Sequence, residues 1–214
     1  MQYLLSDILE LNDRFRRNLI NSVHGFKSVA LVGTSDPDGN HNLAIFSQIF
    51  HIGANPPLVG ILVRPDSVDR HTLQNIRATQ WFSINHIQEP FFKEAHQTSA
   101  RYPQSTSEFD ATGLTPEYYS DFPAPMVKES NVKMLLKRVD ETELINGTIL
   151  VTARIFYLEV PDEIIQEDGF LELHRAGTIT STGLDAYYTV DPLCRLSYAK
   201  VDMPLTEVPL NARQ

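Results

Sequence analysis

The sequence predicts a mainly β protein, an antiparallel β-barrel with a few short helices around it. Short apolar runs of strand length recur from about residue 28 to residue 160, and residues that favour turns separate them. The chain has 214 residues, 42% of them hydrophobic, which is enough for one domain with a substantial core and too little for two ordinary domains. We therefore expect a single domain over residues 1–214, with an N-terminal helix at 3–23, the barrel at about 28–160 and an irregular C-terminal extension.

The N-terminal segment has the spacing of an amphipathic helix. Leu4, Ile8, Leu11 and Phe15 recur every three to four residues, and charged residues fill many of the positions between them. This pattern predicts one helix or two short ones over residues 3–23.

Strand signals begin after Gly25. The run 28–34 is followed by turn residues that include Pro37 and Gly39, so we expect a hairpin that leads into one long strand over 41–51. Because side chains alternate along a strand, one face of it is expected to carry Leu43, Ile45, Ser47 and Ile49.

The middle of the chain mixes strands with short helices. An apolar run at 58–63 predicts a buried strand, followed by a helix over 69–77 and a strand over 81–85. Pro90 has the position of a residue that opens a second helix. Residues 97–125 are polar and lack periodicity, so we expect a long loop, and loops of this length are often functional or cover a site.

Two long strands are predicted in the second half, over 132–144 and 148–160. The Asn-Gly pair at 146–147 lies between them and is a strong hairpin signal. We expect one further element between 164 and 173, and an irregular tail from 177 to 214.

Charge and cysteine content exclude several classes of function. The formal net charge of −9 opposes a general attraction to nucleic acid or to anionic lipid, so a local cluster of donors must hold any anionic ligand. The single cysteine, Cys194, rules out an internal disulfide and a cysteine-based zinc site, and we expect it to be a small buried side chain. The histidines lack metal-ligand spacing, so no metal site is expected. No run approaches the ~20 apolar residues of a membrane span, and we expect a soluble, cytoplasmic protein.

The end of the apolar strand at 58–63 is followed by five residues that all donate hydrogen bonds: Arg64, Ser67, Arg70, His71 and Thr72. A strand end that leads into a helix also offers unpaired N–H groups and the positive end of the helix dipole, which attract an anion. The cluster therefore predicts a phosphate-bearing ligand. The alternative is that both arginines are solvated surface charges and that Asp69 only caps the helix.

The strand before it is also unusual, because Asn42, Ser47 and Gln48 interrupt an apolar pattern with hydrogen-bonding groups. A flat, amphipathic ligand could use these groups. The alternative is an edge strand with one solvated face.

Several runs of the sequence resemble, in the same order, the flavin reductase-like, FMN-binding split-barrel family. They read VALVGTSDPDGN at 29–40, NLAIFS at 42–47, NPPLVGI at 55–61 and HTLQNI at 71–76. Two later runs, HQTSARYP at 96–103 and SEFDATGLT at 107–115, resemble one branch of that family. The resemblance covers about residues 29–160.

The resemblance implies an FMN-binding split β-barrel, antiparallel and Greek-key-like, in a homodimer whose FMN lies near the subunit interface. It implies FMN as the cofactor, NAD(P)H as co-substrate, and a partner monooxygenase or electron-transfer protein. The residues implied to contact the cofactor are Asn42, Ala44, Ile45, Phe46, Ser47, Gln48, Arg64, Ser67, His71, Thr72, Thr98, Ser99 and Ala100. The last three could come from the partner chain, and no catalytic residue is named.

Three functions remain open at this point. The first is an NAD(P)H-dependent flavin reductase that passes hydride from nicotinamide to FMN. The second is a non-enzymatic FMN-binding electron carrier that a protein donor reduces. The third is a flavin-free binding domain on the same barrel, because a fold does not fix a function.

Overall fold

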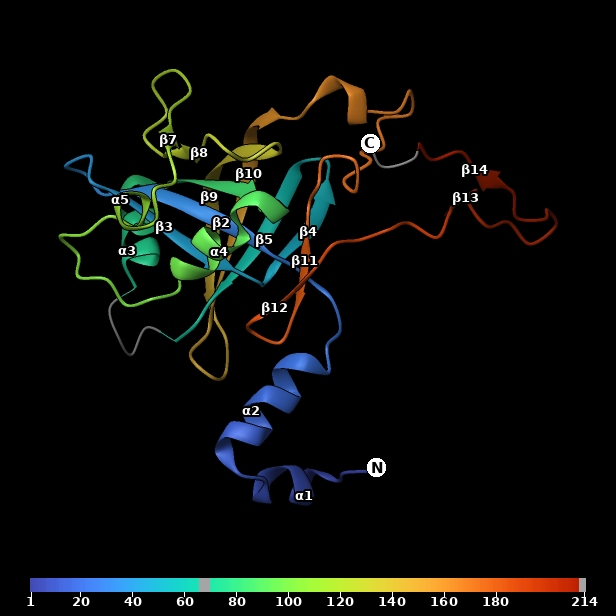
Figure 1. Ribbon diagram of the computed structural model, residues 1–214, viewed down its shortest axis with the longest axis horizontal. Helices are drawn as coiled ribbons and strands as arrows, with labels where there is room; N and C mark the ends of the chain where they lie inside the picture. Colours follow the sequence, from blue (N-terminus) through green and yellow to red (C-terminus); the bar gives the residue numbers. More distant parts are fainter. Residues whose placement is uncertain (66–69, 212–214) are drawn as a thin grey trace.

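A seven-stranded antiparallel sheet forms the centre of the protein, whose computed structural model describes residues 1–65 and 70–211 (Figure 1). Its strands follow the order β3-β2-β6-β9-β10-β5-β4. Their bounds are β2 Ala30–Ser35, β3 His41–Phe46, β4 Ile49–Ala54, β5 Pro57–Val63, β6 Trp81–His86, β9 Lys133–Glu143 and β10 Ile149–Glu159. The prediction of a mainly β, antiparallel fold is confirmed.

The two edges of this sheet, β3 and β4, are neighbours in the chain, and only Ser47 and Gln48 separate them. Two linking residues span at most about 11 Å, so the sheet must curl until its edges approach each other. The Gln48 carbonyl accepts a hydrogen bond of 3.0 Å from the Leu62 N–H, which extends the pairing of β4 with β5 to the link itself. We call Ser47 and Gln48 the corner of the split barrel.

The prediction of one continuous strand over 41–51 is therefore wrong. The chain leaves one sheet edge and joins the other at the corner, so the two halves of the run cannot share one ladder. The predicted common face is wrong for the same reason: Leu43 and Ile45 pack in one hydrophobic cluster, whereas Ile49 packs in the other together with Phe46.

The cluster that contains Phe46 and Ile49, which we call the first cluster, fills the interior of the barrel. Val32, Ile61 and Phe82 are buried there, and helix α3 (His71–Thr79) adds Leu73 and Ile76. The second cluster lies on the other side of β2 and β3. There β3 is covered by the short helices α4 (Phe92–Gln97) and α5 (Glu108–Thr112), which contribute Ala95 and Phe109. Although β3 is an edge strand, it is covered by helices.

Helix α5 lies inside the segment predicted to be a loop, and that prediction is wrong for these residues. The Ser107 hydroxyl accepts a hydrogen bond of 3.2 Å from the Phe109 N–H, which caps the helix at its start. Gly113, at φ 76°, ends it in the left-handed region. Short strands β7 (Pro116–Glu117) and β8 (Met126–Val127) follow in the same segment.

The other helices agree with the sequence. The N-terminal pattern forms two short helices, α1 (Leu5–Glu10) and α2 (Asp13–Ser22), which project below the barrel in Figure 1. Pro90 lies in the 3₁₀ turn η1 (Glu89–Phe91) that leads into α4. No helix within the described residues is both long enough and apolar enough to span a membrane.

The hairpin between β9 and β10 is confirmed, with Gly147 at φ 77°. The element expected between 164 and 173 is reduced to the end of the 3₁₀ turn η2 (Asp162–Ile164) and a bridge between Ile165 and Leu171.

The tail is more ordered than predicted. Strand β11 (Thr180–Thr182) pairs with β1 (Lys27–Ser28) and with β12 (Ala186–Tyr188), so the tail returns to the start of the chain. Beyond it, β13 (Arg195–Leu196) and β14 (Glu207–Val208) form an arm that projects from the barrel (Figure 1). Cys194 lies on this arm and is exposed, so the expectation of burial is wrong.

Candidate functional site

The corner brings together three residues that the sequence marked separately. Ile49 pairs with Ile61, and the Gln48 carbonyl accepts from the Leu62 N–H, so the pairing with β5 extends to the residue next to Ser47. Arg64 is the first residue after β5. Ser47, Gln48 and Arg64 therefore lie at the same end of β5.

Strand β3 presents backbone donors next to this corner. The Leu43 N–H donates a bond of 3.0 Å to Oε2 of Glu108, so it points away from β2. Backbone groups alternate in direction along an antiparallel strand, so the Ile45 N–H points the same way, and no described residue accepts from it. A ligand edge with acceptor atoms fits this free N–H. Ala44 and Phe46 have the opposite parity, and their backbone groups face β2.

A buried polar network ties β3 to the start of α3. The Asn42 amide donates to the Thr72 hydroxyl at 3.1 Å and to the Thr34 hydroxyl at 3.4 Å. The Asn75 amide also donates to the Thr34 hydroxyl, at 3.1 Å. Because the Thr72 oxygen accepts from Asn42, its own proton remains available to a ligand. Asn42 therefore positions α3, and Thr34 is a member of this network that sequence reasoning missed.

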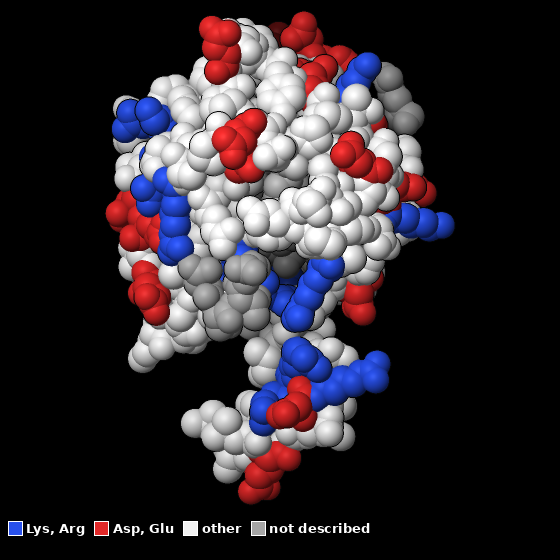
Figure 2. Space-filling view, turned by 90° about the vertical axis from the view of Figure 1, so that its left-hand side faces the viewer, with Lys and Arg blue, Asp and Glu red and all other residues white. Residues whose placement is uncertain are grey.

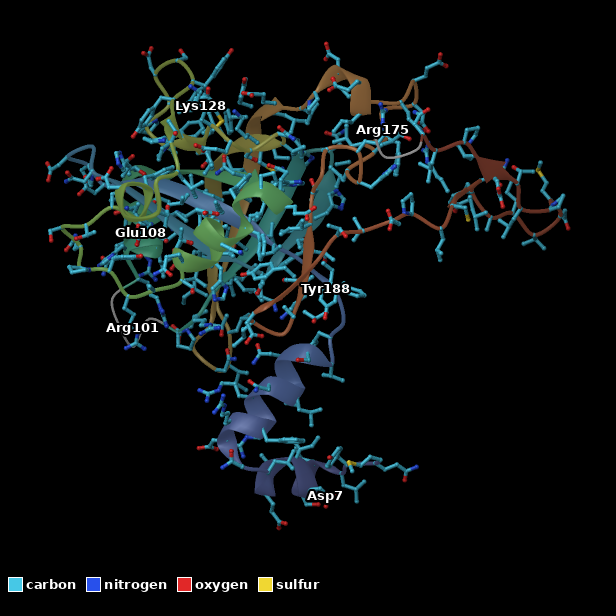
Figure 3. All side chains as sticks on the ribbon, viewed as in Figure 1. Asp7, Arg101, Glu108, Lys128, Arg175 and Tyr188 are labelled. Carbon is cyan, nitrogen blue, oxygen red and sulfur yellow. The ribbon has the colours of Figure 1, made fainter. Side chains whose placement is uncertain are left out.

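Glu108 is a second residue that sequence reasoning did not single out, although it lies within one of the family-like runs. It is 7% exposed and comes from α5 (Figure 3). Burial raises the pKa of this carboxyl, while the Leu43 N–H and the nearby charge of His71 act in the opposite direction. Glu108 thus occupies one outward N–H of β3 and lies near the first residue of α3.

Two cations lie on the same side of the barrel. Lys27, on β1, donates hydrogen bonds from Nζ to the Gly183 carbonyl at 2.8 Å and to the Asn21 carbonyl at 3.1 Å. Burial lowers the pKa of Lys27, and the positive charge of Arg64 lowers it further. Neither residue forms an ion pair with any described carboxylate. Figure 2 shows Lys and Arg side chains around the junction of the barrel with the N-terminal helices. Such a local positive field suits an anion despite the acidic chain.

The remaining predicted residues fall into two groups. Thr98 is buried at the end of α4 and donates from its hydroxyl to the Ala95 carbonyl at 2.8 Å, while Ser99 and Ala100 are exposed. Helix α4 contacts β3, but no hydrogen bond joins these three residues to the corner in the described part of the chain. Ser67, together with the predicted cap Asp69, lies outside the described residues.

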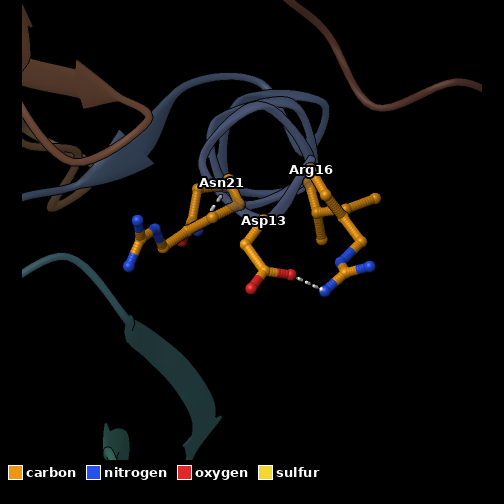
Figure 4. Close-up of a pocket in the computed structure, with 5 residues that line it drawn as sticks. Asp13, Arg16 and Asn21 are labelled. Carbon is orange, nitrogen blue, oxygen red and sulfur yellow. Dashed lines mark hydrogen bonds and ion pairs between the residues drawn. The ribbon is translucent and has the colours of Figure 1, made fainter. Parts of the chain in front are cut away.

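A hollow of about 520 Å³ lies elsewhere on the surface. It is lined by residues of α2, including Asp13, Arg16 and Asn21 (Figure 4). A groove along one exposed helix offers no group from the barrel, so we do not place the site there. Within residues 1–65 and 70–211, no cluster of three or more His, Cys, Asp or Glu side chains is placed to hold a metal ion.

Comparison with known proteins agrees with this geometry. The flavin reductase like domain family matches residues 24–178. A crystal structure from Shewanella frigidimarina NCIMB 400, described as a flavin reductase with split barrel domain, is 50% identical to this chain. It has a TM-score of 0.90 and covers 93% of this chain and 100% of its own.

Two more distant structures share the fold. Nitrilotriacetate monooxygenase component B from Bacillus cereus is 21% identical with a TM-score of 0.80, covering 92% of this chain and 98% of its own. Flavoredoxin of Desulfovibrio vulgaris (Miyazaki F) is 19% identical with a TM-score of 0.70, covering 94% and 98%. The chain belongs to the flavin reductase like domain family, with the split-barrel fold.

Proposed function

We propose that this protein binds FMN at the corner of the split barrel and reduces it with NAD(P)H. The observation that carries the proposal is the meeting of two kinds of donor at one rim. The free N–H of Ile45 and the hydroxyl of Ser47 suit the polar edge of a flat ring, whereas Arg64, which follows the end of β5 next to the corner, supplies a positive charge. A flavin mononucleotide has both an acceptor-rich ring edge and a phosphate.

In this proposal the phosphate is held where β5 ends and α3 begins. Arg64 supplies a planar fork of donors, the Thr72 hydroxyl donates its free proton, and Ser67 and His71 add further donors. Lys27 strengthens the same positive field from β1. These residues fit a doubly charged phosphate, because no described carboxylate competes for Arg64 or Lys27.

The ring would lie along the strand that leads to the corner. The backbone N–H of Ile45 and the side chains of Ser47 and Gln48 would contact its polar edge, and Asn42 would hold α3 in register with β3 through Thr72. The turn of Thr98, Ser99 and Ala100 would contact the ring from the same chain or from the partner.

When bound, FMN supplies the hydride-accepting chemistry. The chain's part is to fix the ring and to place N–H donors where the reduced ring becomes more negative, and no side-chain acid or base is required for this. A nicotinamide ring would stack on the open face of the flavin.

We further propose that the protein acts as a homodimer, and that its reduced flavin serves a partner monooxygenase or an electron-transfer protein. The likeness to component B of nitrilotriacetate monooxygenase supports a partner of the first kind. The likeness to flavoredoxin keeps open the second candidate, a flavin-holding electron carrier that a protein donor reduces.

Anaerobic stopped-flow absorbance separates the two candidates. The reductase proposal predicts that NADH or NADPH bleaches the flavin band much faster in the protein than in a solution of free FMN. If the protein retains FMN and the bleach is no faster than in free FMN, the reductase proposal fails and the electron carrier remains.

A further inference from the structure

The N-terminal helices are amphipathic, and among the described residues nothing buries the apolar face of either one. On α2 and its C-cap, Phe15, Leu19 and Val23 recur every four residues, and Phe15 and Val23 are 53% and 68% exposed. The side chains that line the hollow in Figure 4 lie on the opposite, largely polar face. On α1, Leu5 and Leu9 are 71% and 62% exposed. Neither helix has a buried residue, and isolated helices of six and ten residues are marginal in water.

The C-terminal arm, residues 191–211, has the same property. Its strands β13 and β14 pair through two residues each, and a two-stranded hairpin alone is marginally stable. Leu193, Tyr198 and Val201 are 102%, 90% and 102% exposed. The arm therefore presents apolar side chains on a scaffold that needs a covering partner.

Both segments are nevertheless anchored where they leave the barrel. Lys27 joins the end of the helical segment to the Gly183 carbonyl. The buried carboxylate of Glu172 accepts bonds from the Asn211 N–H at 2.7 Å and from the Asn211 amide at 2.8 Å. Arg195 donates to Oε1 of Gln166 at 2.6 Å, and its guanidinium lies 4.2 Å from the ring centroid of Phe170. These anchors fix the direction in which each segment projects.

The exposed area of the chain points to the same conclusion. The chain exposes 13108 Å², whereas a compact monomer of 24.2 kDa exposes about 10,000 Å². The excess of about 3,000 Å² exceeds the ~800 Å² that each partner contributes to a standard interface. It is of the size that large homodimers bury.

The two segments project from different sides of the barrel, so they cannot cover each other within one chain (Figure 1). In a twofold symmetric dimer, a contact between two different surfaces occurs twice. If the arm of each copy packs on the helical segment of the other copy, both arms and both helical segments are therefore covered.

We propose that two copies of this chain clasp each other, with the C-terminal arm of each copy packed on the apolar face of α1 and α2 of the other. This inference rests on the homodimer of the proposed function and assigns its interface. The sequence alone assigned no role to the C-terminal extension. In this proposal the extension stabilises the dimer.

The test is the mass of the full chain in solution, with and without a charge on either surface. The arm variant is Tyr198→Asp with Val201→Asp, and the helix variant is Phe15→Asp. Ile145→Asp is the matched control, because Ile145 is 108% exposed on the hairpin between β9 and β10. All four positions are at least half exposed, so the barrel is expected to fold in every variant.

Sedimentation velocity at micromolar protein is expected to give twice the chain mass for the unmodified protein and for the control. It is expected to give half that value, one chain mass, for the arm and the helix variants. Dimers that survive both kinds of substitution would overturn the clasp and leave the homodimer standing. A monomeric unmodified protein would overturn both. Retention of added FMN, measured on the same samples, reports on the flavin site separately.

Discussion

The side-chain amide of Asn42 donates a hydrogen bond of 3.1 Å to the hydroxyl of Thr72, and the two residues are 9% and 6% exposed. This bond joins the strand proposed to bind the flavin ring to the helix start proposed to bind the phosphate. The two halves of the site are therefore held in one register, and a change at either residue should weaken the binding of both the ring and the phosphate.

Thr72→Val tests this link. The substitution keeps the shape of the side chain but removes the hydroxyl that accepts from Asn42 and donates to the phosphate. We expect FMN to bind about 10- to 100-fold more weakly, because a hydrogen bond to a charged group contributes ~1.5–3 kcal/mol. Titration of FMN fluorescence measures the change. Thr152→Val, on β10, is the control, and equal affinities of the two variants would remove Thr72 from the site.

Arg64→Ala tests the phosphate contact. We expect FMN affinity to fall by about 10- to 100-fold, since a charge-assisted contact is lost. Riboflavin lacks the phosphate, so its affinity should be nearly unchanged in the same variant. Arg154→Ala, an exposed arginine on β10, should leave both affinities as they are. An equal loss for FMN and riboflavin would show that Arg64 does not act through the phosphate.

Gly33→Ala tests the packing of the barrel. A Cβ at Gly33 would lie 2.2 Å from the Pro125 carbonyl oxygen and 2.6 Å from the Ser83 hydroxyl, so the backbone of the neighbouring segment would have to move. We expect the free energy of unfolding in urea to fall by about 1–3 kcal/mol. At Gly53 the nearest atom would be 3.6 Å away, so Gly53→Ala should be much milder. Equal losses would contradict the packing described for β2.

Acid should release the C-terminal arm. Hydrogen bonds from Asn211, with smaller contributions from Arg175 and Gln166, lower the pKa of Glu172 to about 2 from its usual 4.5. Because the folded-state pKa is depressed, the stability that this carboxylate contributes is complete above pH 4.5 and is lost as the pH falls toward 2. Cleavage of the arm by pepsin should therefore increase across that range.

The matched variants for this prediction are Glu172→Gln and Glu167→Gln. The first should be cleaved throughout the range, since its charge is absent at every pH. The second removes an exposed carboxylate and should follow the unmodified protein. A pH profile that is the same in all three proteins would show that Glu172 does not anchor the arm.

The features that the sequence predicted well are determined locally. The turn at 36–40 and the Asn-Gly pair at 146–147 determine two hairpins, and the continuous apolar run at 58–63 determines a buried strand. The ordered family-like runs then identified the fold, which the match over residues 24–178 confirms.

The features that the sequence missed depend on distant contacts. The corner at 47–48 exists because β4 pairs with β5 and so closes the sheet. The alternation of side chains within residues 41–51 cannot reveal this distant pairing. Glu108 meets Leu43 across 65 positions of sequence, and Thr34 meets Asn75 across 41. Cys194 was expected to be buried from its residue type, but it lies on the projecting arm and is exposed.

The most direct test of the proposed function is the visible absorption spectrum of the purified protein after FMN has been added and free flavin removed. We expect retained bands near ~370 and ~450 nm, and rapid anaerobic loss of the second band on addition of NADH or NADPH. A protein that retains no flavin and does not accelerate the reduction of added FMN would contradict the proposal.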